Sequence, residues 1–190
     1  MQLEPYRLIK ALWILIAIVW AVGMLSAKQT RSREHPGTRI LHILIMVLTF
    51  GLVFKDGFRP GLLDAFFFAP TPLTEWAGVA LTVVGLGLAI VARVMLGGNW
   101  SGSVTVKKDH TLIRSGPYAL VRHPIYTGLL LAMLGAAIAY GRVGCLLGVA
   151  VGVVGLRIKY GVEEAFMMKE FGEQYVVYKQ QVKALIPWVW

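Results

Sequence analysis

The sequence predicts an all-α integral membrane protein with five transmembrane helices and a helical cap at its C-terminal end. Hydrophobic residues make up 57% of the 190 residues, against about 45–50% in soluble domains, and the mean hydropathy is +0.66. These residues gather in long apolar runs, which are typical of membrane spans. The fold class therefore follows both from the share of apolar residues and from their grouping.

Five apolar runs lie along the chain, at residues 8–26, 40–54, 76–96, 124–140 and 143–156. The second has 15 residues, which is short for a bilayer core about 30 Å thick, so flanking residues must complete it. No small-residue cleavage pattern follows the first run, so we expect a span there and not a signal peptide. Segment 55–74 predicts an interfacial loop or a short re-entrant piece. We expect one membrane domain over 1–190, with a two-helix part at 1–75 and a three-helix part at 76–190.

The net charge of +9 is distributed between the apolar runs and does not form one patch, so it predicts membrane orientation and not nucleic-acid binding. Lys and Arg number five on the side of the N-terminus and thirteen on the opposite side, with Arg93 inside the third run. The positive-inside rule therefore places the N-terminus outside and the C-terminus in the cytoplasm. The size suggests a bacterial inner (plasma) membrane. The single cysteine and four histidines without zinc-ligand spacing predict neither a disulfide nor a metal site.

The segment 116–128 joins a polar stretch to the fourth apolar run. Pro124 suits the first turn of a helix, which makes His123 the cap, with Arg122 outside and Tyr126 in the first turn. Free N–H groups and the dipole at such a helix start favour an anionic group, and Arg122 adds a full charge. Gly128 lets a neighbouring helix or a ligand approach closely. An interfacial cluster of structural role remains the alternative to a ligand site.

The fourth and fifth runs predict an antiparallel hairpin that turns near 141–142. Counting equal lengths from that turn brings His123 level with Tyr160, and Glu163 and Glu164 within one turn of the cap. Adjacent carboxylates leaving a membrane span are costly unless they are paired or solvated. We expect one to be wetted and the other to face a positive group. Residues 165–178 then predict an amphipathic helix, broken at Gly172, that covers the site from the cytosolic side.

Four motifs in this order are similar to those of the isoprenylcysteine carboxyl methyltransferase family, within a wider group that includes membrane phospholipid N-methyltransferases. They are Leu96-Gly-Gly-Asn-Trp-Ser101, Asp109-His-Thr-Leu-Ile-Arg-Ser-Gly-Pro-Tyr118, Arg122-His-Pro-Ile-Tyr-Thr-Gly128, and Glu163-Glu164 followed by Phe171-Gly172, Tyr175, Tyr178 and Ile186-Pro187. The resemblance covers residues 93–187. It implies that 76–190 is the catalytic part, with S-adenosylmethionine as methyl donor in a cytosolic C-terminal cofactor pocket.

The resemblance also implies site residues. The cofactor contacts are expected at His110, Thr111, Leu112, Ile113, Tyr118, His123, Pro124, Ile125, Tyr126 and Glu163, with Arg122 adding charge for the donor carboxylate. Glu164 is the alternative to Glu163, and Gly85 and Gly87 resemble a Gly-x-Gly pair attributed to the cofactor site in the phospholipid branch. Where the carboxyl methyltransferases have a substrate-contacting arginine, this chain has Lys159, with Arg157 nearby. Lysine cannot bind a carboxylate in the bidentate manner of arginine.

The acceptor stays open between a prenylcysteine-like carboxylate, a lipid or small amine, and a small thiol. A carboxylate or thiolate needs no general base, whereas an ammonium acceptor needs one, for which Glu164 and Tyr126 are the candidates. We expect the acceptor to enter from the bilayer, with membrane lipids as the other partner and no obligate protein partner. The alternatives are a nicotinamide-dependent membrane reductase of the sterol-reductase type, and a non-catalytic membrane protein.

Overall fold

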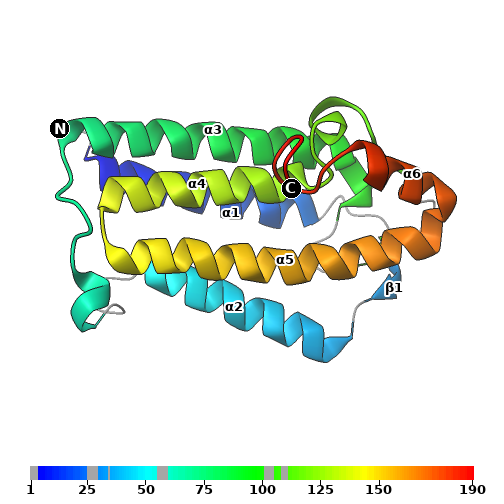
Figure 1. Ribbon diagram of the computed structural model, residues 1–190, viewed down its shortest axis with the longest axis horizontal. Coiled ribbons are helices and arrows are strands. Elements are labelled where there is room, and N and C mark those ends of the chain that lie inside the picture. Colours follow the sequence, from blue (N-terminus) through cyan, green and yellow to red (C-terminus); the bar gives the residue numbers. More distant parts are fainter. Residues whose placement is uncertain (1–3, 25–29, 34, 55–59, 101–104, 108–110) are drawn as a thin grey trace.

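A computed structural model describes residues 4–24, 30–33, 35–54, 60–100, 105–107 and 111–190 (Figure 1). Five long helices form most of it: α1 (Pro5–Met24), α2 (Pro36–Phe54), α3 (Pro72–Leu96), α4 (Pro124–Tyr140) and α5 (Val143–Phe171). Four of them begin with proline, whose fixed φ and missing N–H suit the first helical position. The predicted all-α membrane architecture with five apolar helices is confirmed.

The five helices differ in how far they reach. In the described part of the chain, α1, α2, α3 and α5 are long and apolar enough to cross a membrane. Helix α4 has 17 residues, about 25 Å of rise, which is less than a bilayer core of about 30 Å. Its polar N-terminal end is therefore recessed among longer neighbours, and this is where the candidate site lies.

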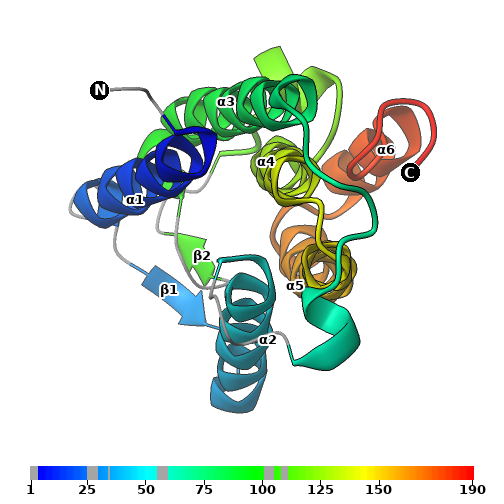
Figure 2. The same cartoon turned by 90° about the vertical axis from the view of Figure 1, so that its left-hand side faces the viewer.

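Helices α3, α4 and α5 lie side by side, with α4 in the middle, α1 against α3, and α2 against α5 (Figure 2). Glycines bring α3 and α4 together at two levels, Gly78 with Gly135 and Gly85 with Gly128. A Cβ on Gly85 would lie 2.5 Å from the Gly128 carbonyl oxygen, so the backbones touch. The close approach expected at Gly128 is confirmed, whereas Gly87 faces open space.

The predicted hairpin turns at Gly141, which takes the left-handed conformation with φ +63°. Arg142 then forms an ion pair with Asp64 at 3.0 Å and lies over the Phe66 ring. The Val143 N–H also donates to the Ala65 carbonyl at 3.0 Å. The part of segment 55–74 that the structure describes, including a 3₁₀ helix at Gly61–Asp64, thus covers this turn.

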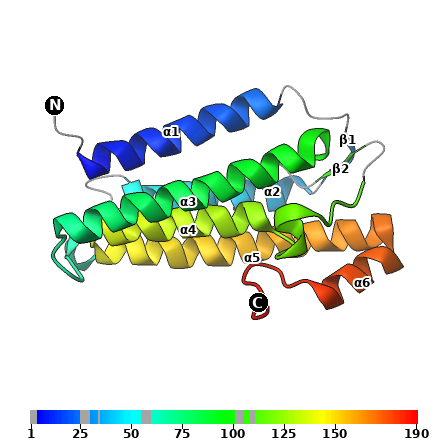
Figure 3. The same ribbon diagram turned by 90° about the horizontal axis from the view of Figure 1, so that it is seen from above.

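Helix α5 continues beyond the apolar run, which ends at residue 156, as far as Phe171, because the polar residues that follow keep helical spacing and find partners. The predicted break at Gly172 (φ +52°) is confirmed: this residue starts α6, Glu173–Gln181, which folds back beside the end of α5 (Figure 3). Two short strands, β1 (Thr30–Arg33) and β2 (Thr105–Lys107), pair in antiparallel fashion at the same end. Short 3₁₀ turns at Gly97–Asn99 and Gly116–Ala119 complete the connections.

Candidate functional site

A cavity opens at the end of the bundle where α4 begins. Its empty volume, including the mouth open to solvent, is about 880 Å³. The walls come from the end of α3, the segment before α4, the first turn of α4, the last turns of α5, and α6. The lining residues are Leu96, Asn99, Trp100, Thr111, Leu112, Ile113, Tyr118, Arg122, His123, Pro124, Ile125, Tyr126, Glu163, Met167, Tyr175 and Tyr178.

His123 occupies the N-cap position of α4, as predicted, but its side chain makes no capping bond. The imidazole instead stacks with the rings of Tyr126 and Tyr160, whose centroids are 5.7 and 4.9 Å away. Its Nε2 lies 3.1 Å from Oε1 of Glu164. The hairpin register that brings His123 level with Tyr160 and next to the acidic pair is confirmed, and the ring faces α5 because its polar partner is there.

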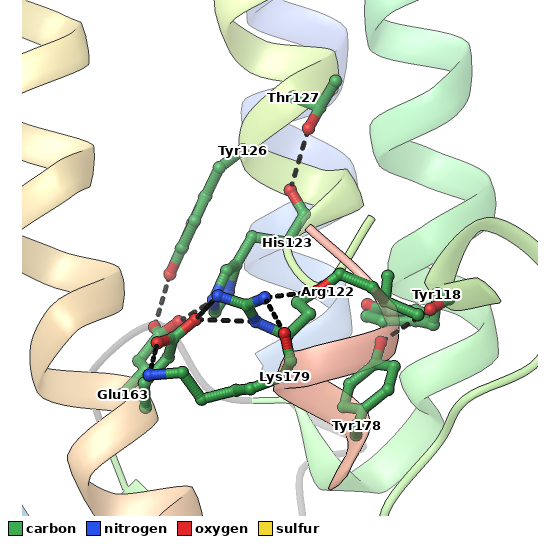
Figure 4. A network of polar contacts seen from close by, with 10 residues as sticks. Tyr118, Arg122, His123, Tyr126, Thr127, Glu163, Tyr178 and Lys179 are labelled. Atoms are coloured by element: carbon green, nitrogen blue, oxygen red, sulfur yellow. Dashed lines mark hydrogen bonds and ion pairs between the residues drawn. The ribbon is translucent and has the colours of Figure 1, made fainter. Parts of the chain in front are cut away.

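Glu164 is the centre of a buried ionic cluster. Figure 4 labels its basic members, Arg122, His123 and Lys179. Its Oε1 accepts from Arg122 Nε at 2.9 Å and Nη2 at 2.6 Å, and Lys179 Nζ lies 2.8 Å from Oε2. The remaining Arg122 nitrogen, Nη1, donates to the carbonyls of Val182 and Lys179. The expectation that one carboxylate faces a positive group is confirmed, and this carboxylate is Glu164.

The Arg122 cluster fixes the C-terminal segment onto the start of α4. The backbone N–H groups of Arg122 and His123 donate to the carbonyls of Lys183 and Ala184, at 2.8 and 3.0 Å. The Thr127 hydroxyl donates to the Leu185 carbonyl at 2.8 Å. The guanidinium of Arg122 therefore joins α4, α5 and the segment after α6, and each of its nitrogens already has a protein acceptor.

Glu163 has a different environment from its neighbour, because adjacent helical residues point about 100° apart. It lines the cavity, and its side chain is 23% exposed against 9% for Glu164. Oε1 accepts a short hydrogen bond from the Tyr126 hydroxyl, and Lys159 Nζ lies 3.9 Å from the same oxygen. His123 Nδ1 is 3.7 Å from Oε2. This is the partly solvated carboxylate of the pair.

Aromatic residues form the wall opposite Glu163. The Tyr118 hydroxyl donates to the Ala92 carbonyl of α3 at 3.2 Å, and the Tyr178 hydroxyl donates to the Tyr118 carbonyl at 2.6 Å. Burial raises the pKa of the Tyr178 phenol to about 12, so it keeps its proton and remains a donor at neutral pH. Tyr175 packs beside Tyr178, with ring centroids 5.9 Å apart, so α6 closes the cavity with two buried rings.

The structure brings most of the predicted cofactor contacts together. Ten of them line the cavity: Thr111, Leu112, Ile113, Tyr118, Arg122, His123, Pro124, Ile125, Tyr126 and Glu163. His110 lies outside the described residues. Glu164, Lys159 and Arg157 do not line the cavity; Arg157 is exposed, with its guanidinium 5.0 Å from the Tyr160 ring centroid. Neither glycine of the Gly-x-Gly pair lines the cavity: Gly85 lies between α3 and α4, and Gly87 faces open space.

Six lining residues were not among the predicted contacts: Leu96, Asn99, Trp100, Met167, Tyr175 and Tyr178. A signal for five of them was present in the sequence. Leu96, Asn99, Trp100, Tyr175 and Tyr178 belong to the motifs that carry the resemblance, and the last two are three residues apart, which places both rings on one helical face. Met167 lies in the last turns of α5, where the sequence alone does not fix which side chains turn inward.

Comparison with known proteins decides the family. A model of the phospholipid methyltransferase family matches residues 73–174, more than half of the chain. The chain belongs to the phospholipid methyltransferase family. The match runs from α3 to the start of α6 and so covers most of the cavity, while α1 and α2 lie outside it.

Relatives of this family member confirm the resemblance seen in the motifs. The protein-S-isoprenylcysteine O-methyltransferase of Schizosaccharomyces pombe is 32% identical over 67% of this chain and 54% of its own length. Methanethiol S-methyltransferase 1 of Bradyrhizobium diazoefficiens is 39% identical over 37% of this chain and 24% of its own. The chain spans about half the length of the isoprenylcysteine O-methyltransferases that it matches.

A solved structure shares the fold. The eukaryotic intramembrane Ras methyltransferase, isoprenylcysteine carboxyl methyltransferase, superposes with a TM-score of 0.52 at 24% identity, over 82% of this chain and 54% of that one. At this identity the likeness extends to the arrangement of the helices. The shared helical arrangement supports the assignment of this chain as an integral membrane protein.

Proposed function

We propose that this protein is an integral membrane methyltransferase that uses S-adenosylmethionine. The observation that carries the proposal is the cavity at the start of α4, which the Glu163 carboxylate lines together with the aromatic residues Trp100, Tyr118, Tyr126, Tyr175 and Tyr178. The family comparison supports methyl transfer over the nicotinamide-dependent reductase and the non-catalytic alternatives.

The residues of the cavity fit the chemical groups of this donor. Glu163 suits its ammonium or ribose hydroxyls, and the faces of Tyr118, Tyr126 and Trp100 suit a sulfonium cation and an adenine ring. For the donor carboxylate, Arg122 is already saturated by Glu164 and by carbonyls. We therefore assign the carboxylate to the first N–H groups of α4, which lack partners within the helix and lie at its positive end.

When bound, S-adenosylmethionine supplies an electrophilic methyl carbon: the lone pair of the acceptor forms the new bond to this carbon, and the electrons of the broken carbon–sulfur bond stay on sulfur. Tyr126 holds the Glu163 carboxylate through its hydroxyl and thereby fixes the orientation of the donor. The rings of Tyr175 and Tyr178 exclude water from the cavity. For an ammonium acceptor, Glu163 with Tyr126 is the proton-accepting pair that lines the cavity.

Glu164 has a positioning role in this proposal, in place of the catalytic role considered from the sequence. Its two oxygens bind Arg122, His123 and Lys179, and it does not line the cavity. Lys159, 3.9 Å from Glu163, and the exposed Arg157 are the basic residues of α5 that an acceptor entering from the bilayer would approach.

The acceptor is lipophilic or small and comes from the bilayer. Relatives named for isoprenylcysteine and for methanethiol support a carboxylate or a thiol, and the phospholipid branch supports an amine. We further propose that the cavity end faces the cytoplasm of a bacterial plasma membrane, because the sequence predicts thirteen of the Lys and Arg residues on that side.

The proposal is tested with the purified full chain in detergent by calorimetric titration with S-adenosylhomocysteine. We expect binding, and we expect Glu163→Gln to weaken it about tenfold, since a charge-assisted hydrogen bond contributes about 1.5–3 kcal/mol. Glu170→Gln, an exposed change on the same helix, is the matched control. Unchanged affinity for Glu163→Gln would remove this carboxylate from the site, and binding of a nicotinamide nucleotide alone would favour the reductase.

The acceptor is identified by incubating the same protein with S-adenosylmethionine labelled on the methyl group. Prenylcysteine, long-chain amine and small thiol acceptors are compared in parallel. We expect label in one class only, and about fivefold slower transfer by Glu163→Gln at a donor concentration that half-saturates the wild type, as the expected affinity loss of about tenfold requires. Transfer by the variant at the wild-type rate would contradict the assigned role.

A further inference from the structure

Arg93 is a buried cation in the last turn of α3 that the proposed chemistry does not use. The residue is 6% exposed, and an arginine at membrane depth is costly, so such a residue marks a functional or organising site. Its Nη1 donates to the Gly97 carbonyl at 3.0 Å and its Nη2 to the Gly23 carbonyl at 2.7 Å. Gly23 belongs to α1, so the guanidinium joins the ends of two helices.

The third contact of the Arg93 guanidinium is with Trp100, a residue of the cavity wall. The Cζ atom of Arg93 lies 4.1 Å from the centroid of the Trp100 ring, and Trp100 lines the cavity. Trp20 of α1 meets the same indole edge-on, with centroids 6.1 Å apart at 80°. Helix α1 therefore reaches Trp100 twice, directly through Trp20 and indirectly through Gly23 and Arg93.

The partners of Arg93 in the described part of the chain are two carbonyl oxygens and an indole face, and its buried Nε makes no hydrogen bond there. A buried charge without a carboxylate partner is costly. A planar fork that binds two carbonyls and stacks on a ring is the geometry that arginine supplies and lysine does not. The free-energy cost of burying the Arg93 charge therefore indicates that this residue is required for the geometry of its guanidinium.

Gly23 permits this arrangement. A Cβ at this position would lie 2.7 Å from Arg93 Nη2 and 3.3 Å from Cζ, so any side chain on residue 23 displaces the guanidinium. Gly87 on α3 is the natural comparison, because it is also a helical glycine, but a Cβ added there would meet nothing within 4 Å. A side chain added at residue 23 thus acts on the cavity wall through Arg93, whereas Trp20 contacts Trp100 directly.

We infer that α1 contributes to the donor site. Arg93 couples α1 to the cavity wall and is a positioning residue for Trp100. Helix α1 lies outside residues 73–174 that match the family, so the match does not assign it this role. The identity of the ligand in the test rests on the proposed function, whereas the coupling itself rests on the contacts of Arg93.

The first test compares Gly23→Val with Gly87→Val, using S-adenosylhomocysteine titrated into the full chain. We expect Gly23→Val to weaken binding about threefold to tenfold, the range of coupling through residues that do not touch the ligand. Gly87→Val should leave binding within about twofold. Equal affinities for the two variants would overturn the inference.

The second test does not depend on the ligand. Acrylamide quenching of tryptophan fluorescence is measured in the wild type, Arg93→Lys and Arg93→Met, each with Trp100 present and with Trp100→Phe. We expect quenching to increase in Arg93→Met, to be partly restored in Arg93→Lys, and to be independent of residue 93 once Trp100 is absent. No increase in Arg93→Met would overturn the inference. If the wild type fails to bind S-adenosylhomocysteine, the proposed function fails while this measurement still decides the coupling.

Discussion

Glu163 and Glu164 are adjacent in sequence, but their carboxylates lie in different environments. The start of α4 presents Tyr126 toward the first and Arg122 toward the second, and Lys179 from α6 completes the second environment. Because consecutive helical residues point about 100° apart, only one of the pair can face the cavity. The other holds the walls of the cavity together.

Removing the charge of Glu164 should therefore reduce stability first. Glu164→Gln leaves the buried guanidinium of Arg122 without its anionic partner, and breaking a buried ion pair costs about 3–5 kcal/mol. We expect a lower midpoint for thermal loss of the near-ultraviolet circular dichroism. Glu163→Gln, by contrast, should keep the wild-type midpoint while it loses ligand affinity. Equal midpoints for Glu164→Gln and the wild type would show that the ionic cluster contributes no net stability.

Among the helices, α3 and α4 depend most on small residues. The contacts Gly78–Gly135 and Gly85–Gly128 repeat after seven residues on each helix, which is two turns of an antiparallel pair. Between membrane helices such close backbone packing replaces the hydrophobic effect as the attractive interaction. The cavity depends on it, since Trp100 follows α3 and Tyr126 lies on α4.

A side chain between these helices should separate them. In Gly128→Val the added atoms overlap the Gly85 carbonyl, and overpacking of this kind costs about 1–3 kcal/mol. We expect unfolding at a lower mole fraction of sodium dodecyl sulfate in mixed micelles. Gly87→Val, on the outward face of α3, is the control. If both variants unfold at the wild-type fraction, the two helices tolerate separation and the packing argument is wrong.

The helices that could be predicted from the sequence are those whose signals are local. Pro124 and Gly141 mark both ends of α4, and hydropathy locates the other spans. Helical structure was predicted both for the apolar run and for 165–178, but not that a single helix α5 runs on to Phe171, because its polar end is stabilised by contacts with α4 and α6, which are distant in sequence. The pairing of β1 with β2 was missed for the same reason, since four-residue and three-residue strands joined across two helices leave no periodicity.

For the molecule as a whole, the hairpin register was the decisive prediction. Counting residues from Gly141 was sufficient to bring His123 to the acidic pair, because two antiparallel helices rise equally per residue. Counting residues could not predict which groups the Arg122 guanidinium binds. Its partners include the carbonyls of Lys179 and Val182, and the return of the C-terminal segment after α6 depends on the Gly172 turn.

The cavity end and the opposite end of the bundle are well separated, and the distribution of Lys and Arg predicts that the cavity faces the cytoplasm (Figure 1). Cysteine labelling tests this after the single native cysteine, buried Cys145, is changed to serine. Ser115→Cys places an exposed thiol beside the cavity, and Leu62→Cys places one at the other end, where Leu62 is 77% exposed. A membrane-impermeant maleimide added to intact spheroplasts should label Leu62→Cys and should reach Ser115→Cys only after permeabilisation. The reverse pattern would place the cavity outside, where it could not draw on cytoplasmic S-adenosylmethionine, and the proposed function would then fail together with the orientation.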